Sequence, residues 1–183
     1  MKQFTYVGGW LIAGLVWFTS VAPVSAVGPK LLVLLVVDQF RADYVETYGG
    51  QWSGGLRRLI DNGAWFTEAA YPYLNTVTCA GHATIATGAY PSTHGMISNS
   101  WWDRALSQSV RCTFDPDVEV VSYGIPHEPG ESPNRLRVPT LSDELRLQLD
   151  SDARVVTFSL KERSAIMLGG HSADVVTWLG RNN

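Results

Sequence analysis

Two blocks of consecutive apolar residues stand out along the chain. Residues 31–37 are leucine or valine throughout and stop at Asp38, and residues 154–160 form a second, mostly apolar block that stops before Lys161. Continuous apolar runs of this length predict strands that are buried on both faces of a parallel sheet. Residues 175–179 predict the start of a further strand.

Helical spacing of apolar residues marks parts of the chain between these strands. In residues 54–62, Leu56, Leu59 and Ile60 recur at helical intervals, and Gly63 follows as a C-cap. This pattern predicts a short amphipathic helix.

The middle of the chain carries weaker patterns. Residues 64–70 predict a short extended segment, and residues 81–87 predict a helix that is closed by Gly88. Residues 98–134 are rich in Asp, Pro, Ser and Gly, so we expect loops there, with one strand at residues 118–121.

The clearest helix start lies at Thr140. Asp143 follows three residues later, as in a capping box, and Leu141, Leu145 and Leu149 form an apolar stripe. Strands that alternate with helices predict an α/β fold with a mostly parallel sheet.

The first 26 residues have the composition of a secretory signal. Lys2 supplies a positive charge, residues 7–18 are largely apolar, and Val24-Ser25-Ala26 offers a cleavage site between small residues. We expect residues 1–26 to be a signal peptide, cleaved after Ala26, and the protein to be periplasmic or secreted, with no stable membrane association afterwards. An uncleaved N-terminal anchor is the alternative.

Composition narrows the function classes. A formal net charge of −3, with both signs interspersed, argues against a nucleic-acid-binding surface. Cys79 and Cys112 are the two cysteines, too few for a disulfide scaffold or an all-cysteine zinc site. In an exported protein they either form one disulfide or remain two small buried thiols, and the sequence leaves both possibilities open.

Asp38 and Lys161 are candidates for chemistry, because α/β sheets bind ligands at the carboxyl ends of their strands. An aspartate in this position either binds a metal or caps a loop. Lys161 and Arg163, two residues apart in an expected extended segment, either contact one anion together or form a solvated pair.

Hydroxyl and amide side chains flank the helix predicted at residues 81–87. A helix N-terminus favours an anion, and the hydroxyl of Thr78 just before it either attacks phosphorus or caps the helix. Asn99 either donates its amide to a phosphoryl oxygen or stabilises a turn.

In this order, the candidates resemble the alkaline phosphatase superfamily, in particular the PafA-type, phosphate-irrepressible alkaline phosphatases of the bacterial periplasm. The resemblance covers residues 29–170. It rests on Val36-Val37-Asp38-Gln39-Phe40-Arg41, Thr76-Val77-Thr78, Gly81-His82-Ala83, Thr87-Gly88, Tyr90-Pro91, Thr93-His94-Gly95, Asn99, Trp102-Asp103-Arg104 and Lys161-x-Arg163.

This resemblance implies a three-layer alkaline-phosphatase-like α/β fold with a mostly parallel central sheet. Asp38 would be a zinc ligand, and Thr78 would be both a metal ligand and the nucleophile that is phosphorylated during turnover. Asn99, Lys161 and Arg163 would bind the phosphoryl oxygens.

The family holds two zinc ions, and most of the ligands lie in the second half of a domain far longer than this chain. Asp38 and Thr78 are the two family ligands present, so the remaining ones are expected downstream of Asn183. We therefore expect residues 27–183 to be the N-terminal portion of the catalytic domain, without its C-terminal metal-binding half. Four histidines are not expected to be zinc ligands, namely His82, His94, His127 and His171.

The function implied for the full-length protein is zinc-dependent hydrolysis of phosphate monoesters through a phosphothreonine intermediate, with the 183-residue chain inactive by itself. A type I phosphodiesterase or nucleotide pyrophosphatase is one alternative, and a non-enzymatic stand-alone module is another. The expected partners are small-molecule phosphate esters, not nucleic acid, and the expected state is monomeric. Lys161 and Arg163 favour monoesters, because a diester carries a substituent where they would lie.

Overall fold

The computed structural model describes residues 30–119, 121, 129–149 and 153–179, so the expected signal peptide and His127 lie outside it. The chain divides into two units, one that ends at Leu35 and one that begins at Val36. The helices are α1 Tyr44–Tyr48, the 3-10 helix η1 Gly49–Gln51, α2 Gly55–Asn62, α3 Thr78–Thr87, α4 Pro91–His94, α5 Leu141–Gln148 and α6 Glu162–Gly169. The strands are β1 Ser100–Asp103, β2 Gln108–Arg111, β3 Phe114–Glu119, β4 Pro129–Glu131, β5 Val156–Ser159 and β6 Val175–Trp178.

Strands β5 and β6 are parallel neighbours, joined by α6. Parallel strands need such a crossover, which makes β5–α6–β6 the βαβ unit expected of an α/β fold. Both strands lie within the predicted segments, but α6 was not predicted. Lys161 is the N-cap of this helix and does not begin a loop.

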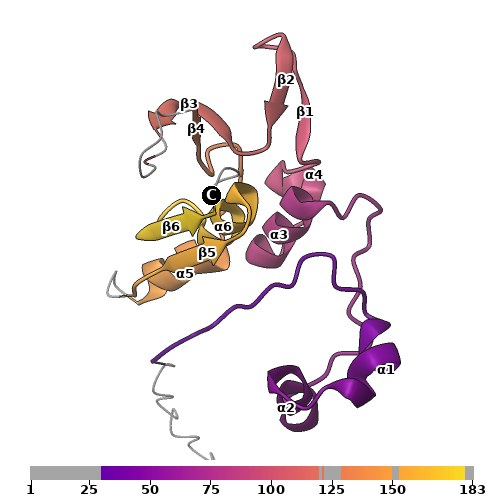
Figure 1. The fold of residues 1–183 in the computed structure, drawn as a ribbon. Helices are drawn as coiled ribbons and strands as arrows, with labels where there is room; N and C mark the ends of the chain where they lie inside the picture. Colours follow the sequence, from indigo (N-terminus) through magenta and orange to yellow (C-terminus); the bar gives the residue numbers. More distant parts are fainter. Residues whose placement is uncertain (1–29, 120, 122–128, 150–152, 180–183) are drawn as a thin grey trace, which may run out of the picture. The chain divides into compact units, whose positions relative to one another are not determined.

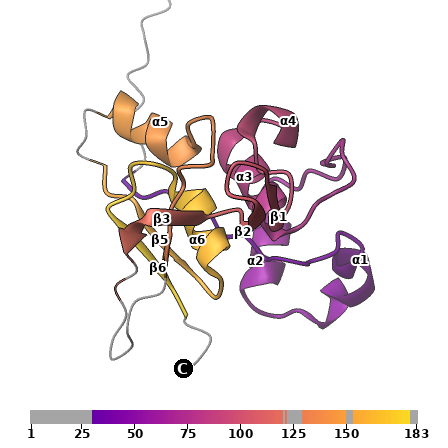
Figure 2. The same ribbon diagram turned by 90° about the horizontal axis from the view of Figure 1, so that it is seen from above.

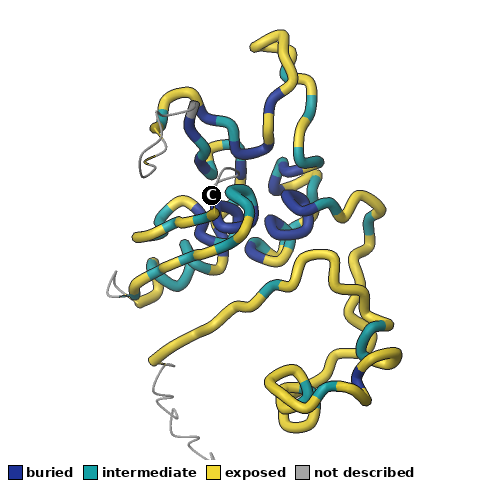
Figure 3. Tube along the Cα trace, viewed as in Figure 1, coloured by how far each residue is buried: buried dark blue, intermediate teal, exposed yellow. Residues whose placement is uncertain are grey.

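Helix α6 lies between the β5–β6 pair and α3, as Figures 1 and 2 show from two directions. The packing buries Cys79 and Ala83 of α3 against Ile166 and Met167 of α6. Figure 3 shows the two helices as the main buried part of the chain. This apolar contact is what places the N-terminal ends of α3 and α6 in a fixed relation.

Strand β5 is buried on one face only, which corrects the expectation of a strand buried on both. Thr157 and Val176 face Gly169 of α6, whereas Val156 and Phe158 on the opposite face are largely exposed. Within the described residues α6 covers the first face of the β5–β6 pair, and nothing there covers the second.

The segment expected as loops, residues 98–134, forms two antiparallel hairpins. β1 pairs with β2 in regular register, from Ser100 opposite Arg111 to Asp103 opposite Gln108. β3 pairs with β4, and it ends at Glu119, so the strand predicted at 118–121 starts earlier than expected. Asp, Ser and Pro within the strands hid these hairpins, since such residues are typical of turns. In the described part of the chain, β5–β6 is the only parallel sheet.

Residues 31–37 do not form the predicted strand. They are extended, but no strand of the described sheets pairs with them, and Leu31, Val33 and Leu35 are largely exposed. Apolar composition favours a strand without providing the neighbour that its backbone groups need. Residues 64–70 are not a strand either, since they contain a turn at 67–68.

Local capping signals predicted the helix ends well. Thr140 caps α5 in a full capping box with Asp143. Gly63 ends α2, and Gly88 ends α3 with a φ of 64°, the left-handed conformation that glycine adopts without strain. The start of α3 was predicted three residues too late, because the helix already begins at Thr78. None of the helices in the described ranges is long and apolar enough to cross a membrane.

Candidate active site

Asp38 is the centre of the candidate site, because one of its carboxylate oxygens contacts two other candidates. Its Oδ2 accepts a hydrogen bond from Thr78 Oγ1 at 3.1 Å and a charged hydrogen bond from Lys161 Nζ at 2.7 Å. Asp38 and Lys161 are 123 residues apart in the chain, and about one third of each side chain is exposed. The structure therefore joins three of the five predicted site residues directly, at a place that solvent reaches.

Thr78 is the first residue of α3, and its side chain is nearly buried. Its hydroxyl does not cap the helix, since it donates to Asp38. The N-cap position is held by Val77, which has no side-chain acceptor. The sequence Thr-Val-Thr therefore places a hydroxyl at a helix N-terminus without using that hydroxyl for the helix itself.

Asn99 supplies the missing cap of α3 from a distant part of the chain. Its Oδ1 accepts the backbone N–H of Cys79 at 2.9 Å, and its backbone carbonyl accepts the N–H of Cys112 at 3.0 Å. Because the amide oxygen faces a donor, the Nδ2 group of Asn99 is the end that points away from the Cys79 amide. The amide oxygen thus fixes the Asn99 side chain, and its Nδ2 donates no hydrogen bond within the described residues.

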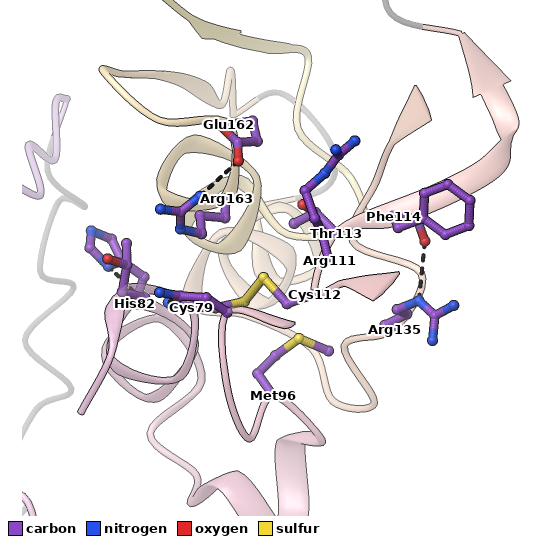
Figure 4. Close-up of a disulfide and its surroundings, with 12 residues drawn as sticks. Cys79, His82, Met96, Arg111, Cys112, Thr113, Phe114, Arg135, Glu162 and Arg163 are labelled. Carbon is purple, nitrogen blue, oxygen red and sulfur yellow. Dashed lines mark hydrogen bonds and ion pairs between the residues drawn. A yellow bond between two sulfur atoms is a disulfide. The ribbon is translucent and has the colours of Figure 1, made fainter. Parts of the chain in front are cut away.

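Cys79 and Cys112 form a disulfide, with their Cα atoms 6.7 Å apart, so the alternative of two buried thiols is wrong. Figure 4 shows the bond beside Met96, between the start of α3 and the end of the β1–β2 hairpin. Asn99 is hydrogen-bonded to the backbone of both cysteines. The disulfide therefore fixes the distance between the two groups that hold Asn99.

Lys161 and Arg163 do not lie in one extended segment, as the sequence predicted. Lys161 is the N-cap of α6 and bonds Asp38, while Arg163 is in the first turn of the helix and its Nη1 donates to Glu162 at 2.8 Å. In Figure 4 the Arg163 side chain extends from α6 toward Cys79 and His82. Its Nε is buried and has no hydrogen-bond acceptor in the described part of the chain.

Charges around the site shift the pKa values of two groups. Partial burial raises the pKa of Asp38, but the hydrogen bonds from Lys161 and Thr78 outweigh burial and leave the pKa below its ordinary value. Burial lowers the pKa of His82, and the positive charges of Lys161 and Arg163 add to this effect. Asp38 is therefore an anion and His82 a neutral ring at neutral pH.

The two histidines of the motif are held in buried hydrogen bonds. His82 Nδ1 donates to the carbonyl of Thr78 at 2.8 Å, which supports the first turn of α3. His94 Nδ1 accepts the N–H of Met96 at 3.0 Å, so its Nε2 carries the proton and donates to Thr84 Oγ1 at 3.0 Å. In both rings these hydrogen bonds hold neighbouring parts of α3 and α4 in place.

Asp38 and Thr78 offer two oxygen donors to a metal, and within the described ranges no further donors join them. Among the described residues, no group of three or more His, Cys, Asp or Glu side chains is placed to hold a metal ion. Zinc sites in proteins use three or four protein ligands. The described residues therefore do not form a zinc site by themselves, and the Lys161 ammonium neutralises the Asp38 carboxylate instead.

Sequence reasoning missed the neighbours that orient the predicted residues. Glu162 binds Arg163, and the backbone of Cys79 and Cys112 binds Asn99. Two signals were present in the sequence, namely Glu162 next to Arg163 and the pair of cysteines. The contacts that they make depend on the position of α6 and on the disulfide.

Comparison with known proteins gives the family. The family model of type I phosphodiesterase / nucleotide pyrophosphatase matches residues 32–180. Alkaline phosphatase PhoV of Synechococcus elongatus is 38% identical over 160 residues, which are 87% of this chain and 29% of PhoV. Alkaline phosphatase PafA of Elizabethkingia meningoseptica is 38% identical over 151 residues, which are 82% of this chain and 28% of PafA.

A solved structure shows the same fold. The crystal structure of wild-type alkaline phosphatase PafA matches with a TM-score of 0.72 and 36% identity, over 79% of this chain and 28% of that one. The expected alkaline-phosphatase-like α/β fold is thereby confirmed, and the chain spans less than one third of the length of these relatives. Fold, motif order and family match agree: the chain belongs to the type I phosphodiesterase / nucleotide pyrophosphatase family and is similar within it to PafA-type alkaline phosphatases.

Proposed function

We propose that residues 27–183 carry the nucleophile and part of the phosphoryl-binding groups of a phosphomonoesterase. The observation that supports this most is the shared contact of Asp38 Oδ2 with the Thr78 hydroxyl and the Lys161 ammonium. This contact supports a site in which Thr78 is the nucleophile, Asp38 orients it and Lys161 supplies a cation for the substrate phosphate.

Thr78 is the proposed nucleophile. Because its O–H hydrogen points to Asp38, the lone pairs of the oxygen face away from the carboxylate and are available to attack phosphorus. The attack forms the Oγ1–P bond and breaks the bond between phosphorus and the leaving oxygen. Thr78 loses its hydroxyl proton, and the leaving group takes up a proton and departs as an alcohol. Water then hydrolyses the phosphothreonine to inorganic phosphate and restores the Thr78 hydroxyl. The free N–H groups at the start of α3 favour a dianion next to this oxygen.

Lys161, Arg163 and Asn99 are the proposed contacts for the phosphoryl oxygens. A phosphate monoester brings two negative charges, which compete with Asp38 for Lys161 and with Glu162 for Arg163. The Nδ2 end of Asn99 is a neutral donor held in place by Cys79. Two cations favour a monoester over a diester, since a diester has one charge fewer and an extra substituent.

Metal dependence is part of the proposal for the longer protein. Asp38 and Thr78 would contribute two oxygen ligands, and the other ligands of two zinc ions would come from sequence that the relatives carry beyond the matched region. Residues 27–183 would then be the N-terminal portion of the catalytic domain. By itself the 183-residue chain is expected to be inactive, because the donor set of its described residues is incomplete.

The test is a pair of variants in the protein extended to the length of its relatives. Thr78→Ala is expected to lower kcat/KM for p-nitrophenyl phosphate by about 10³-fold or more, because the covalent route is lost. Thr78→Ser keeps a hydroxyl and is the matched control, expected to retain most of the activity. Full activity in Thr78→Ala would refute the assignment.

Diester hydrolysis is the second candidate, favoured by the description of the matching family. The two are separated by the ratio of rates on p-nitrophenyl phosphate and bis-p-nitrophenyl phosphate. Replacing Lys161 and Arg163 by alanine is expected to lower the monoester rate about 10²-fold or more while leaving the diester rate much less affected. A monoester preference that survives the loss of both side chains would speak against the proposed contacts.

A further inference from the structure

A cavity lies apart from the five residues of the candidate active site. It is a cavity of about 490 Å³ beside α4 and β1, lined among others by Trp101, Trp102, Arg104, Arg135 and Arg137. None of the five proposed active-site residues lines it. The Trp102-Asp103-Arg104 motif, which the proposed function leaves unexplained, forms part of its wall.

One of the three arginines has a structural role. Arg135 Nη1 donates to Asp103 at 2.9 Å, its Nε donates to the carbonyl of Phe114 at 3.1 Å, and its guanidinium lies over the ring of Trp101. Figure 4 shows the bond to Phe114. Both carboxylate oxygens of Asp103 accept hydrogen bonds, because the oxygen that does not face Arg135 accepts two backbone N–H groups in the turn after β1. This acid is therefore not available to the remaining arginines.

Arg104 and Arg137 are the other two arginines, and both are exposed. In the described part of the chain, neither forms an ion pair with a carboxylate or donates a side-chain hydrogen bond. The cavity thus has two free guanidinium groups after Asp103 and Arg135 have neutralised each other. Guanidinium groups bind phosphate and carboxylate oxygens with two parallel hydrogen bonds.

Trp102 gives the same cavity a flat apolar surface. Its side chain is 65% exposed, and its partner residue on the neighbouring strand, Ser109, is small. An exposed indole next to free cations suits a ligand that joins an aromatic ring to an anion, since bases stack on tryptophan. The volume falls within the range of about 300–1,000 Å³ that small-molecule sites have.

We propose that this Arg–Trp cavity binds an oxyanion carried on a flat ring, as in a nucleoside monophosphate. Arg104 and Arg137 hold the anionic group, and Trp102 stacks on the ring. Arg135 keeps Trp101 in place beneath them. The proposal concerns a binding site separate from Thr78, and it does not depend on the proposed hydrolysis.

Isothermal titration with AMP tests the proposal, carried out in EDTA so that no metal-dependent turnover interferes. The protein is the 183-residue chain carrying Lys161→Ala, which weakens any binding at the candidate active site. We expect one AMP site, with affinity reduced about tenfold by Arg104→Gln and by Arg137→Gln. Arg58→Gln, an exposed arginine of α2 away from the cavity lining, is the matched control and is expected to bind as the parent does.

Separate ligands distinguish the contribution of the ring to the affinity from that of the anionic group. Trp102→Ala is expected to weaken AMP about tenfold and leave the affinity for inorganic phosphate unchanged, because phosphate has no ring to stack. Adenosine, which has the ring alone, is expected to bind more weakly than AMP. Circular dichroism of each variant verifies that the fold is retained.

Three results would overturn the proposal. One is the absence of saturable AMP binding in the Lys161→Ala chain. If the unsubstituted chain binds AMP, all binding belongs to the candidate active site, and if it does not, the cavity binds no AMP. Another is an AMP affinity that Arg104→Gln and Arg137→Gln both leave unchanged. The last is an equal loss for AMP and inorganic phosphate in Trp102→Ala. A failure of Thr78→Ala to lower hydrolysis would bear only on the proposed function.

Discussion

Replacing Asp143 by asparagine puts an NH₂ group where backbone N–H and hydroxyl donors face both oxygens of the carboxylate. Oδ2 accepts from the N–H of Thr140 at 2.8 Å and from its hydroxyl at 3.0 Å, and Oδ1 accepts from the N–H and hydroxyl of Ser172 at 2.9 and 2.7 Å. The backbone N–H of His171 adds a further hydrogen bond to Oδ1 at 2.9 Å, and the ring Nδ1 of His171 lies 3.2 Å from Oδ2. An asparagine can satisfy one side of this arrangement and must oppose donors on the other.

The size of the effect follows from the pKa of Asp143. Burial raises this pKa, but the hydrogen bonds from Thr140, Ser172 and His171 outweigh burial and lower it from 3.8 to about 2. At 1.36 kcal/mol per pKa unit, the ionised carboxylate contributes about 2 kcal/mol to the free energy of unfolding at neutral pH. The side chain is only 12% exposed, so solvent screens this contribution little.

Urea unfolding followed by circular dichroism measures the effect at several pH values. At pH 7 we expect Asp143→Asn to lower the free energy of unfolding by about 2 kcal/mol or more. Because the folded-state pKa is depressed, the stabilisation is complete above the unfolded pKa of 3.8 and is lost as the pH falls toward 2. The difference between Asp143→Asn and the unsubstituted chain should therefore shrink over that window.

A matched control separates this effect from a general loss of charge. Asp61→Asn removes an exposed carboxylate that pairs with Arg57 on α2, and it should leave the urea midpoint unchanged. The reasoning is wrong if Asp143→Asn unfolds at the same urea concentration as the unsubstituted chain. It is also wrong if the difference at pH 2 is as large as at pH 7.

Three further predictions concern other parts of the chain. Gly170→Ala should lower the free energy of unfolding by about 2 kcal/mol or more, because Gly170 has a φ of 71° and its added Cβ would collide with Thr140 and Asp143. Thermal unfolding measures this effect, and Gly50→Ala, whose Cβ would meet open space, is the control. Reducing the Cys79–Cys112 disulfide should lower the free energy of unfolding by roughly 3–4 kcal/mol in urea titrations with and without reductant, given the 33-residue separation; an unchanged midpoint would contradict this. The 183-residue chain should retain fewer than two zinc ions in metal analysis after dialysis, since two oxygen donors do not hold zinc; two retained ions would contradict the incomplete donor set.

Elements that depend on neighbours in the chain were predictable. Thr140 and Asp143 form a capping box because both partners lie within one helical turn. Gly88 ends α3 because a left-handed residue is needed there and glycine adopts it freely. Strands β5 and β6 were recognisable because β-branched and aromatic residues favour extended backbone.

Elements that depend on a partner far away in the chain were not predictable from the sequence. Residues 31–37 have the composition of a buried strand, yet in the described structure no strand pairs with them. The hairpins β1–β2 and β3–β4 contain residues typical of turns, and pairing across the hairpin overrides that preference. Helix α6 was not predicted, because Lys161 and Arg163 are charged residues that indicate a loop after a strand. In the structure the helix is stabilised by Ile166 and Met167, which are buried.

The sequence by itself determined which residue types are available at the candidate site and in what order they occur. Motif order was enough to predict the family, and the family match over residues 32–180 confirms it. Only the tertiary structure decided that Asp38, from before the first helix, meets Lys161 at the start of α6 and Thr78 at the start of α3. The physical reason is that helix starts and turns are set by contacts within a few residues. Asp38 lies 123 residues before Lys161, and it contacts Thr78 and Lys161 together only when the packing of α3 on α6 has brought those two helix starts close.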